Sequence, residues 1–249
     1  MTWVAWVTRI EPHFSDEWKT LGIFYSIKLS TFEINMDREL LMAALSFRCS
    51  ATNTMVHPLG PIGPTVLDIT AILGTSPSGL PIDTKLSHYQ FDLDLKTIFD
   101  DYVIEVLTKK HQELSKEDMH KLPKNFFNYI TLINHFAGSE KEDLKKGEHE
   151  AFLFYWYNKF IICTKSNKCL VENMPMAEAL ATGHVLGLSL AILANLNRWL
   201  VEASVGKIDP HIFKYFFGLK DLSDDKFLIF RHQKYLSSIK LPASAWEET

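Results

Sequence analysis

Apolar residues recur every three to four positions along most of the chain, a spacing that places them on one face of a helix. The helix predicted over residues 185–203 is apolar on nearly every face, so we expect it at the centre of the core. The predicted helices span residues 15–22, 23–29, 38–47, 100–110, 125–136, 151–164, 176–181, 185–203, 211–217 and 226–238.

The helix over residues 38–47 has a defined start and a defined inner face. Asp37 precedes it and is a suitable N-cap residue, because a carboxylate accepts hydrogen bonds from the free amides of the first turn. The residues expected to face inward are Leu40, Leu41, Ala44, Leu45 and Phe47.

Glycine and proline are densest between residues 44 and 79. Residues 52–57 alternate small polar and apolar side chains, which indicates an extended piece. Residues 59–63 combine glycine, which tolerates positive φ, with proline, which fixes φ, and this favours a turn that reverses the chain.

A short capped helix is predicted directly after this turn. Thr65 is a good N-cap, and Asp68 lies at the position from which a carboxylate reaches back to the cap amide. Gly74 suits the left-handed position that ends a helix. The expected inner face comprises Val66, Ile69, Ile72 and Leu73.

Three stretches lack a helical period. Residues 31–36 look extended, and so do residues 89–99, whose first part alternates apolar and polar side chains. Residues 139–150 form the most charged segment, predicted to be an exposed loop. No linker rich in proline or serine divides the chain. The predicted fold is therefore mainly α: a single globular helical domain over residues 1–249, with a small β-hairpin or extended strands near residues 31–36 and 52–63.

Composition narrows the class of protein. The chain has 249 residues, of which 47% are hydrophobic and 12% aromatic, enough for a packed core. Its net charge of −4 does not support a broad basic surface for nucleic acid. Three cysteines are few for a disulfide-stapled protein, no secretory signal is visible, and the longest apolar window is too short to span a bilayer. We expect a soluble, intracellular protein with no membrane contact.

The glycine-rich run over residues 60–65 precedes a helix N-terminus, which is the setting of a phosphate-binding loop. It lacks the Gly-Lys-Ser/Thr ending that holds phosphate and magnesium, and its prolines remove two amides from the loop. A turn followed by a helix cap is the favoured interpretation.

Two further groups of residues are candidate metal sites. Cys163 and Cys169 with His149 and His184 lack the short paired spacing of zinc ligands, so buried thiols are favoured. Asp92 and Asp94, with Asp68, would have to converge to hold divalent metals, and solvated carboxylates are the commoner outcome.

The aromatic run Phe152, Phe154, Tyr155, Trp156 and Tyr157 suits base stacking in a single-stranded nucleic-acid binder. Few basic residues accompany the run, and a buried helix is the stronger interpretation. We therefore predict no catalytic, cofactor-binding or metal-binding residues, and no cofactor.

Several motifs, in order along the chain, resemble the plant mobile domain, a transposon-derived family with host members of the Maintenance of Meristems type. The resemblance begins with Trp3, Arg9, Glu11, Pro12, Trp18 and Gly22. It continues through residues 43–47, 51–56, 60–63, 64–71 and 74–79, and then through residues 149–157, 175–183 and 191–199. Thr70, Met55 and Tyr157 depart from the family pattern.

The resemblance implies a helical, nuclear, non-catalytic module linked to transposon silencing, genome stability or meristem maintenance. It also implies a protein partner, such as a phosphatase-like protein or a chromatin component. The candidate partner-binding turns are at Gly60, Pro61, Gly63, Pro64 and Pro77.

A second hypothesis is a nucleic-acid-binding or metal-dependent enzyme remnant of a mobile element. Family labels often read aminotransferase-like, yet no lysine lies in a recognisable pyridoxal-phosphate context. The oligomeric state stays open at this point.

Overall fold

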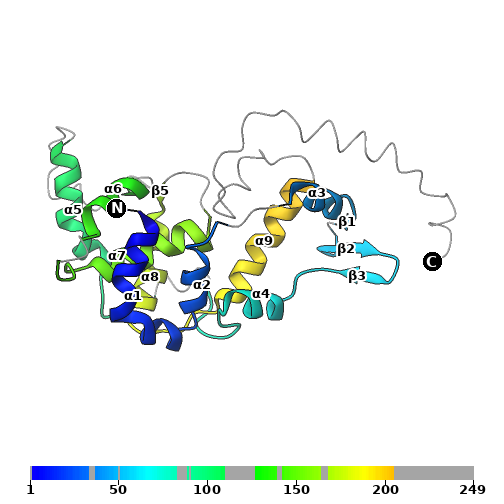
Figure 1. Ribbon diagram of the computed structural model, residues 1–249, viewed down its shortest axis with the longest axis horizontal. Helices are drawn as coiled ribbons and strands as arrows, with labels where there is room; N and C mark the ends of the chain where they lie inside the picture. Colours follow the sequence, from blue (N-terminus) through cyan, green and yellow to red (C-terminus); the bar gives the residue numbers. More distant parts are fainter. Residues whose placement is uncertain are drawn as a thin grey trace. The chain divides into compact units, whose positions relative to one another are not determined.

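The computed structural model describes residues 2–33, 37–49, 51–82, 89, 91–109, 127–138, 142–163 and 168–204. Helices predominate among them, and the strands are short (Figure 1), so the mainly α prediction is confirmed. The helices are α1 (Trp3–Thr20), α2 (Phe24–Leu29), α3 (Arg38–Ser46), α4 (Val66–Leu73), α5 (Leu95–Lys109), α6 (Tyr129–Phe136), α7 (Glu148–Trp156), the π-helix η3 (Tyr157–Ile161), the 3₁₀-helix η4 (Val171–Asn173), α8 (Met174–Ala181) and α9 (Leu188–Ser204).

The strands form two small antiparallel sheets. β1 (Arg48–Cys49), β2 (Thr54–His57) and β3 (Gly60–Ile62) pair in the order β1-β2-β3, and β4 (Phe127–Asn128) pairs with β5 (Lys168–Cys169). The predicted hairpin within residues 52–63 is thus present. Residues 31–33 form a turn and a bend, whereas residues 34–36 lie outside the described part.

The chain divides into two compact units. The first comprises Met1–Glu33 with Thr65–Ala194, and the second comprises Ile34–Pro64 with Asn195–Thr249. The helix α9 supplies residues to both. The expectation of a single domain stays a prediction, as do the helices expected over residues 211–217 and 226–238, which lie outside the described residues.

Helix α7 lies at the centre of the first unit's core, the place expected for the helix over residues 185–203. The burial predicted for the helix over residues 151–164 is confirmed for the residues in α7. Every residue of α7 from Ala151 to Trp156 is buried. Phe152 stacks on Trp18 of α1 at a centroid distance of 5.2 Å and on Trp3 at 4.8 Å. These aromatic rings, distant in sequence, bring α1 and α7 together.

Helix α1 is much longer than the helix predicted over residues 15–22, because it begins at Trp3 and continues through Pro12. A proline in a helix cannot donate to the carbonyl four residues earlier, here that of Thr8. Both residues are exposed, so water can satisfy the Thr8 carbonyl. The proline therefore does not end α1, and the apolar residues near the N-terminus continue one buried helical face.

Two indole N–H groups of α1 are paired with consecutive residues of α7. Trp6 Nε1 donates to Glu148 Oε1 at 3.2 Å, and Trp18 Nε1 donates to His149 Nε2 at 3.1 Å. Glu148 and His149 are themselves buried. The prediction of an exposed charged loop over residues 139–150 is therefore wrong for its last residues, while residues 139–141 lie outside the described part.

The stretch 89–99 was predicted to be extended, and this is wrong from Leu95 onward, where α5 begins. Two carboxylates cap the N-terminus of α5. Asp94 accepts from the amide of Lys96 and from the hydroxyl of Thr97, and Glu178 of α8 accepts from the amide of Leu95. The second of these caps comes from a residue that is distant in sequence.

The capping prediction for α4 is confirmed in detail. Thr65 and Asp68 form a reciprocal capping box, and Gly74 ends the helix with φ 65°. Ile69 is buried as predicted, but Ile72 is 66% exposed. Thr70 takes the inner position instead, and its hydroxyl donates to Ser189 Oγ at 2.9 Å. A polar contact therefore replaces one of the expected apolar ones.

The second unit's described part consists of α3, the three-stranded sheet and the last residues of α9. Asp37 caps α3, as predicted, by accepting from the amide of Leu40. Leu45 is buried, whereas Leu40 is 67% exposed and Phe47 is 51% exposed, so the predicted inward positions of these two residues are wrong. The predicted all-round burial of α9 is also wrong, because Leu190, Ala194 and Arg198 are exposed at four-residue spacing. No described helix is long and apolar enough to cross a membrane.

Candidate functional site

The hairpin of β2 and β3 carries two of the five predicted partner-binding residues, Gly60 and Pro61, but not as a turn. The reversal is made by Pro58 and Leu59, and Gly60 and Pro61 lie in β3. The predicted turn at 59–63 is therefore placed wrongly. Leu59, at the tip, is 91% exposed.

Strand geometry explains why β3 tolerates Pro61. The amide of Val56 donates to the Phe47 carbonyl at 2.7 Å, so the backbone groups of Val56 point toward β1. Pro61 lies opposite Val56, and its backbone therefore points away from β2. A residue with no N–H can occupy this edge position without losing a hydrogen bond of the sheet.

The remaining predicted residues differ in their surroundings. Gly63 follows β3 beside Asn53 and Thr54, and Pro64 is half-buried. Pro77 is exposed, in the segment between Gly74 and Leu80, and it belongs to the first unit. The other four residues belong to the second unit, so the hairpin alone is treated as one site.

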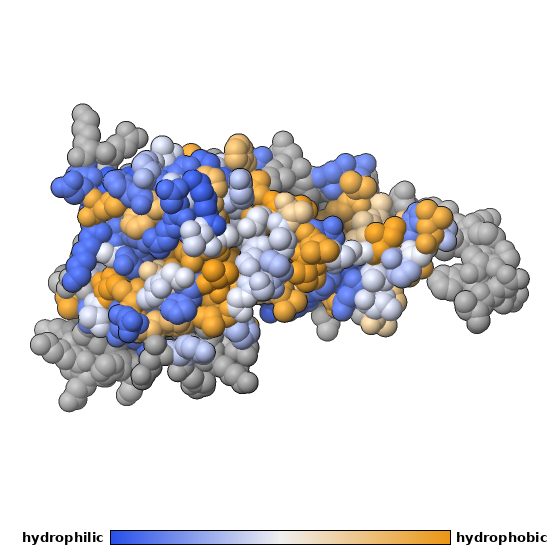
Figure 2. Space-filling model, turned by 90° about the horizontal axis from the view of Figure 1, so that it is seen from below, coloured by the Kyte–Doolittle hydropathy of each residue, from blue (hydrophilic) through white to orange (hydrophobic). Residues whose placement is uncertain are grey.

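One face of the sheet carries an exposed apolar row. Phe47, the C-cap residue of α3, directly precedes β1, and its carbonyl accepts from the amide of Val56 in β2. Val56 in turn lies opposite Pro61 of β3. Phe47 is 51% exposed, Val56 is 53% exposed, and Pro61 is exposed as well. We call these three residues the apolar row. Apolar surface is drawn in orange in Figure 2, which shows it reaching the exterior of the molecule in several places.

A second row of smaller residues lies beside the apolar row on the same face. The strand register places Cys49, Thr54 and Gly63 two residues further along their strands. We call these the small row. Neither row contains an ionisable side chain other than the thiol of Cys49, so the face carries little charge at neutral pH.

The side chain of Arg48 lies on the opposite face of the sheet and bonds to α9. Successive side chains of a strand alternate between faces, so Arg48, Met55 and Ile62 point away from the apolar row. The guanidinium of Arg48 donates to the Asn197 carbonyl of α9 at 3.2 Å and to Asn53 Oδ1 at 3.1 Å. The face with the apolar row is therefore the one turned away from this end of α9.

Cys49 is the accessible thiol among the described cysteines, since Cys163 and Cys169 are buried. Hydrogen bonds from the Thr52 side chain, the Thr52 amide and the Ala51 amide lower the pKa of Cys49. Burial raises the pKa of Cys163 to about 12 and also raises that of Cys169. Cys49 is thus the thiol most suited to react with an alkylating reagent.

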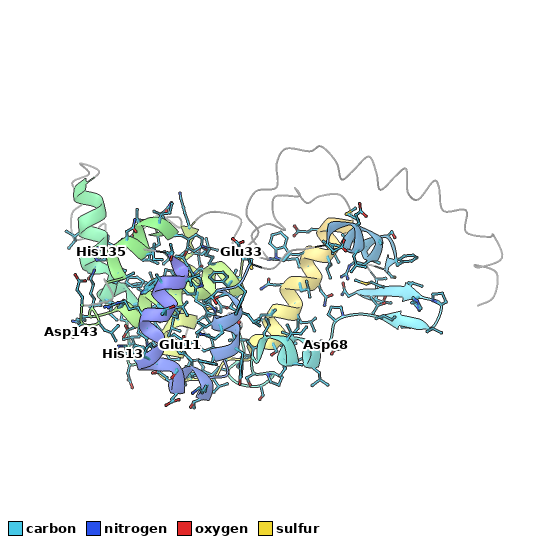
Figure 3. All side chains as sticks on the ribbon, in the orientation of Figure 1. Glu11, His13, Glu33, Asp68, His135 and Asp143 are labelled. Atoms are coloured by element: carbon cyan, nitrogen blue, oxygen red, sulfur yellow. The ribbon has the colours of Figure 1, made fainter. Side chains whose placement is uncertain are left out.

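The carboxylates weighed as a metal site are used as helix caps. Asp68, labelled in Figure 3, accepts from the amide and hydroxyl of Thr65, at 2.7 Å each, and these bonds lower its pKa. Asp94 caps α5, and Asp92 is exposed in the preceding bend. In the ranges that the structure describes, no three His, Cys, Asp or Glu residues come together to hold a metal.

The histidines weighed as zinc ligands have other partners. His149 accepts from Trp18 and stacks on Phe14 at a centroid distance of 3.7 Å, and burial lowers its pKa to about 4. His184 Nδ1 is hydrogen-bonded to Thr182 Oγ1 at 3.0 Å. The aromatic run over residues 152–157 is buried, so the core interpretation of that run is confirmed.

Sequence reasoning missed the buried ion pair between Arg9 and Glu148. Their side chains are 4% and 0% exposed, and Arg9 Nε lies 2.9 Å from Glu148 Oε1. Burial acts to raise the pKa of Glu148, but Arg9 and the amides of Lys145 and Gly138 together hold it below its ordinary value. No local signal marks the pair, because 138 residues separate the two positions.

Comparison with known proteins identifies the family to which most of the chain is similar. The Plant mobile domain family profile matches residues 22–220, a span that includes the hairpin, α4, α7 and α9. No curated protein and no solved structure matches the chain.

Proposed function

The chain belongs to the plant mobile domain family, and from this premise we propose that it is a non-catalytic protein-interaction module. The observation that carries the proposal is the apolar row of Phe47, Val56 and Pro61 on the face turned away from Asn197. Aligned apolar side chains at the surface favour contact with another macromolecule, because association removes their area from water.

The wider role follows from the family resemblance. We propose that the module acts in the nucleus, in transposon silencing, genome stability or meristem maintenance. A phosphatase-like protein or a chromatin component is the proposed partner. The low charge of the face supports a protein partner more than nucleic acid, since nucleic-acid binding depends on cations placed against phosphates.

The state of the ionisable side chains supports a role without bond-making. Asp68 and Asp94 cap helices, His149 is buried and hydrogen-bonded to an indole, and Glu148 is paired with Arg9. Each of these groups has a structural task that accounts for its position.

The test is affinity capture from plant nuclear extract with the full chain as bait. Val56→Asp places a charge in the apolar row, and we expect it to abolish capture of specific partners. Ile62→Asp is the matched control, because Ile62 is 54% exposed on the opposite face of the same hairpin. The double substitution of Pro61→Ala and Pro64→Ala is expected to weaken capture.

Equal capture by wild type and Val56→Asp would contradict the proposed site. Equal loss with Val56→Asp and Ile62→Asp would point to damage of the hairpin, and would likewise remove the support for this face.

A further inference from the structure

We propose that the chain's own residues 211–217 reversibly cover the apolar row, and that a protein partner has to displace them. The inference rests on the proposed interaction function, because it names the element that regulates access to the same face. Three features of the chain carry it: the exposed apolar area of the second unit, the reach of the chain after α9, and the pattern of the segment.

The described part of the second unit exposes more large apolar side chains than it buries. Its buried apolar side chains are Leu45, Trp199 and Leu200. Those that are more than half exposed are Leu40, Phe47, Val56, Leu59 and Ile62. A cover that removes part of this area from water stabilises the unit. Residues 205–249 belong to the same unit and lie outside its described part, and they supply the apolar side chains that follow α9.

The end of α9 places the following residues near the sheet. Asn197 of α9 accepts a hydrogen bond from Arg48 of β1, and α9 ends at Ser204, about 10 Å further along the helix axis. Residues 205–210 can extend over about 20 Å. The three strands together span about 10 Å. A segment that begins at residue 211 can therefore reach the apolar row.

The helix that the sequence predicts over residues 211–217 has one apolar side. The side chains on it are Ile212, Phe213, Phe216 and Phe217. They lie within about 140° of the helix circumference, and Lys214 lies outside this arc. A helix of seven residues is about 10 Å long, which matches the width of the three-stranded sheet. The segment therefore fits the sheet in length and in apolar character.

Two observations select this segment over other apolar occupants. The family profile extends to residue 220, so it places residues 211–217 in one module with the hairpin and leaves out the helix predicted over residues 226–238. The segment is also tethered, so its effective concentration at the row is on the order of millimolar. A free molecule of equal intrinsic affinity, including a second copy of the chain, competes only when its own concentration is as high.

Occupancy by the segment regulates partner binding. A partner binds the fraction of molecules whose apolar row is uncovered, and its apparent affinity is reduced by that fraction. The segment is thus a competitor built into the chain. A substitution that weakens its apolar side should expose the row and increase capture of the partner.

The first experiment tests the contact with a disulfide in the full chain. Cys49 lies opposite Thr54, on the same face as Val56, and is the accessible thiol among the described cysteines. The variants are Phe217→Cys, on the apolar side of the segment, and Lys214→Cys, its matched control. In dilute solution with diamide, we expect the disulfide to Cys49 to form at least about tenfold faster in the first variant, because its thiol is held at the row. Peptide mapping by mass spectrometry measures the rate.

The second experiment tests the competition. Phe216→Asp places a charge on the apolar side of the segment, and Lys214→Asp is its control. In affinity capture from plant nuclear extract, we expect Phe216→Asp to capture more of the partner than wild type, and Lys214→Asp to capture the same amount. Alkylation of Cys49 by iodoacetamide should also be faster in Phe216→Asp. Circular dichroism checks that the variants retain the fold.

The outcomes separate this inference from the proposed function. Equal disulfide rates for Phe217→Cys and Lys214→Cys overturn the cover. Capture by Phe216→Asp that does not exceed wild type overturns the competition. If the disulfide rates are equal but Val56→Asp still abolishes capture, the interaction function stands and only this inference fails. If the rates differ but Val56→Asp captures like wild type, the contact stands and the proposed function fails.

Discussion

Two phenylalanines, one in each unit, differ sharply in how much of their surface is buried. Phe152 of the first unit is fully buried between Trp3, Trp6 and Trp18, whereas Phe47 of the second is 51% exposed. The first unit also buries polar groups and pairs them, as in Arg9 with Glu148. The ring of Phe152 therefore stabilises the fold of the first unit, whereas about half of the surface of Phe47 stays in contact with water.

This contrast teaches where tolerance to substitution should lie. A buried aromatic ring contributes the transfer free energy of its whole surface, and its removal leaves a cavity. A ring on an exposed sheet face contributes little to folding, because much of it stays in water. Three predictions test the contrast, beginning with the one of largest effect.

The first prediction compares two phenylalanines. Phe152→Ala should lower the free energy of unfolding by about 3–5 kcal/mol, since it empties the site between three tryptophans. Phe47→Ala should lower it far less, by about 1 kcal/mol at most. Urea denaturation followed by tryptophan fluorescence measures both. Equal losses would mean that the second unit is also held by a core that includes Phe47.

The second prediction concerns the buried ion pair. Glu148→Gln should destabilise the protein by about 3 kcal/mol, because it removes the carboxylate that is paired with the buried Arg9 guanidinium. Asp16→Asn breaks the exposed pair with Lys19 and should leave the urea midpoint unchanged. A Glu148→Gln protein as stable as wild type would show that Arg9 finds another partner.

The third prediction is a pH dependence that arises from His149. Burial lowers its pKa from 6.5 to about 4, so in acid the unfolded chain takes up a proton that the folded chain refuses. The neutral imidazole imposes no such penalty above pH 6.5, and stability should fall by about 2 kcal/mol between pH 7 and pH 5. The loss should level off below about pH 4 for this group.

Urea denaturation at a series of pH values measures this effect, and His149→Gln provides the control. The variant should be less stable at neutral pH, yet it should lose less stability than wild type between pH 7 and pH 5. Parallel curves for the two proteins would assign the acid sensitivity to other groups.

Local features of the fold could be predicted from the sequence. The capping box of Thr65 and Asp68 and the left-handed Gly74 depend on residues within one short helix, and they appear as predicted. Asp37 at the start of α3 and the buried run in α7 were found for the same reason. A short-range pattern is enough where the partners are neighbours in sequence.

Features set by distant residues could not be predicted in this way. Glu148 looked like part of a solvated charged loop because its partner Arg9 lies far away in the chain. Leu95 begins a helix partly because Glu178 of another helix caps it. Pro61 looked like a turn residue, and only the pairing of β2 with β3 shows that it lies at an edge.

The paired indoles of Trp6 and Trp18 have a consequence for the length of α1. The two N–H groups bond to consecutive residues of α7, Glu148 and His149. The eleven intervening residues, 7–17, therefore set the distance and the rotation between the two tryptophans. Adding or deleting one residue there would rotate the tryptophan beyond the change by about 100°, away from its acceptor. This stretch of helix should therefore accept changes of residue type on its outer side, but no change in number.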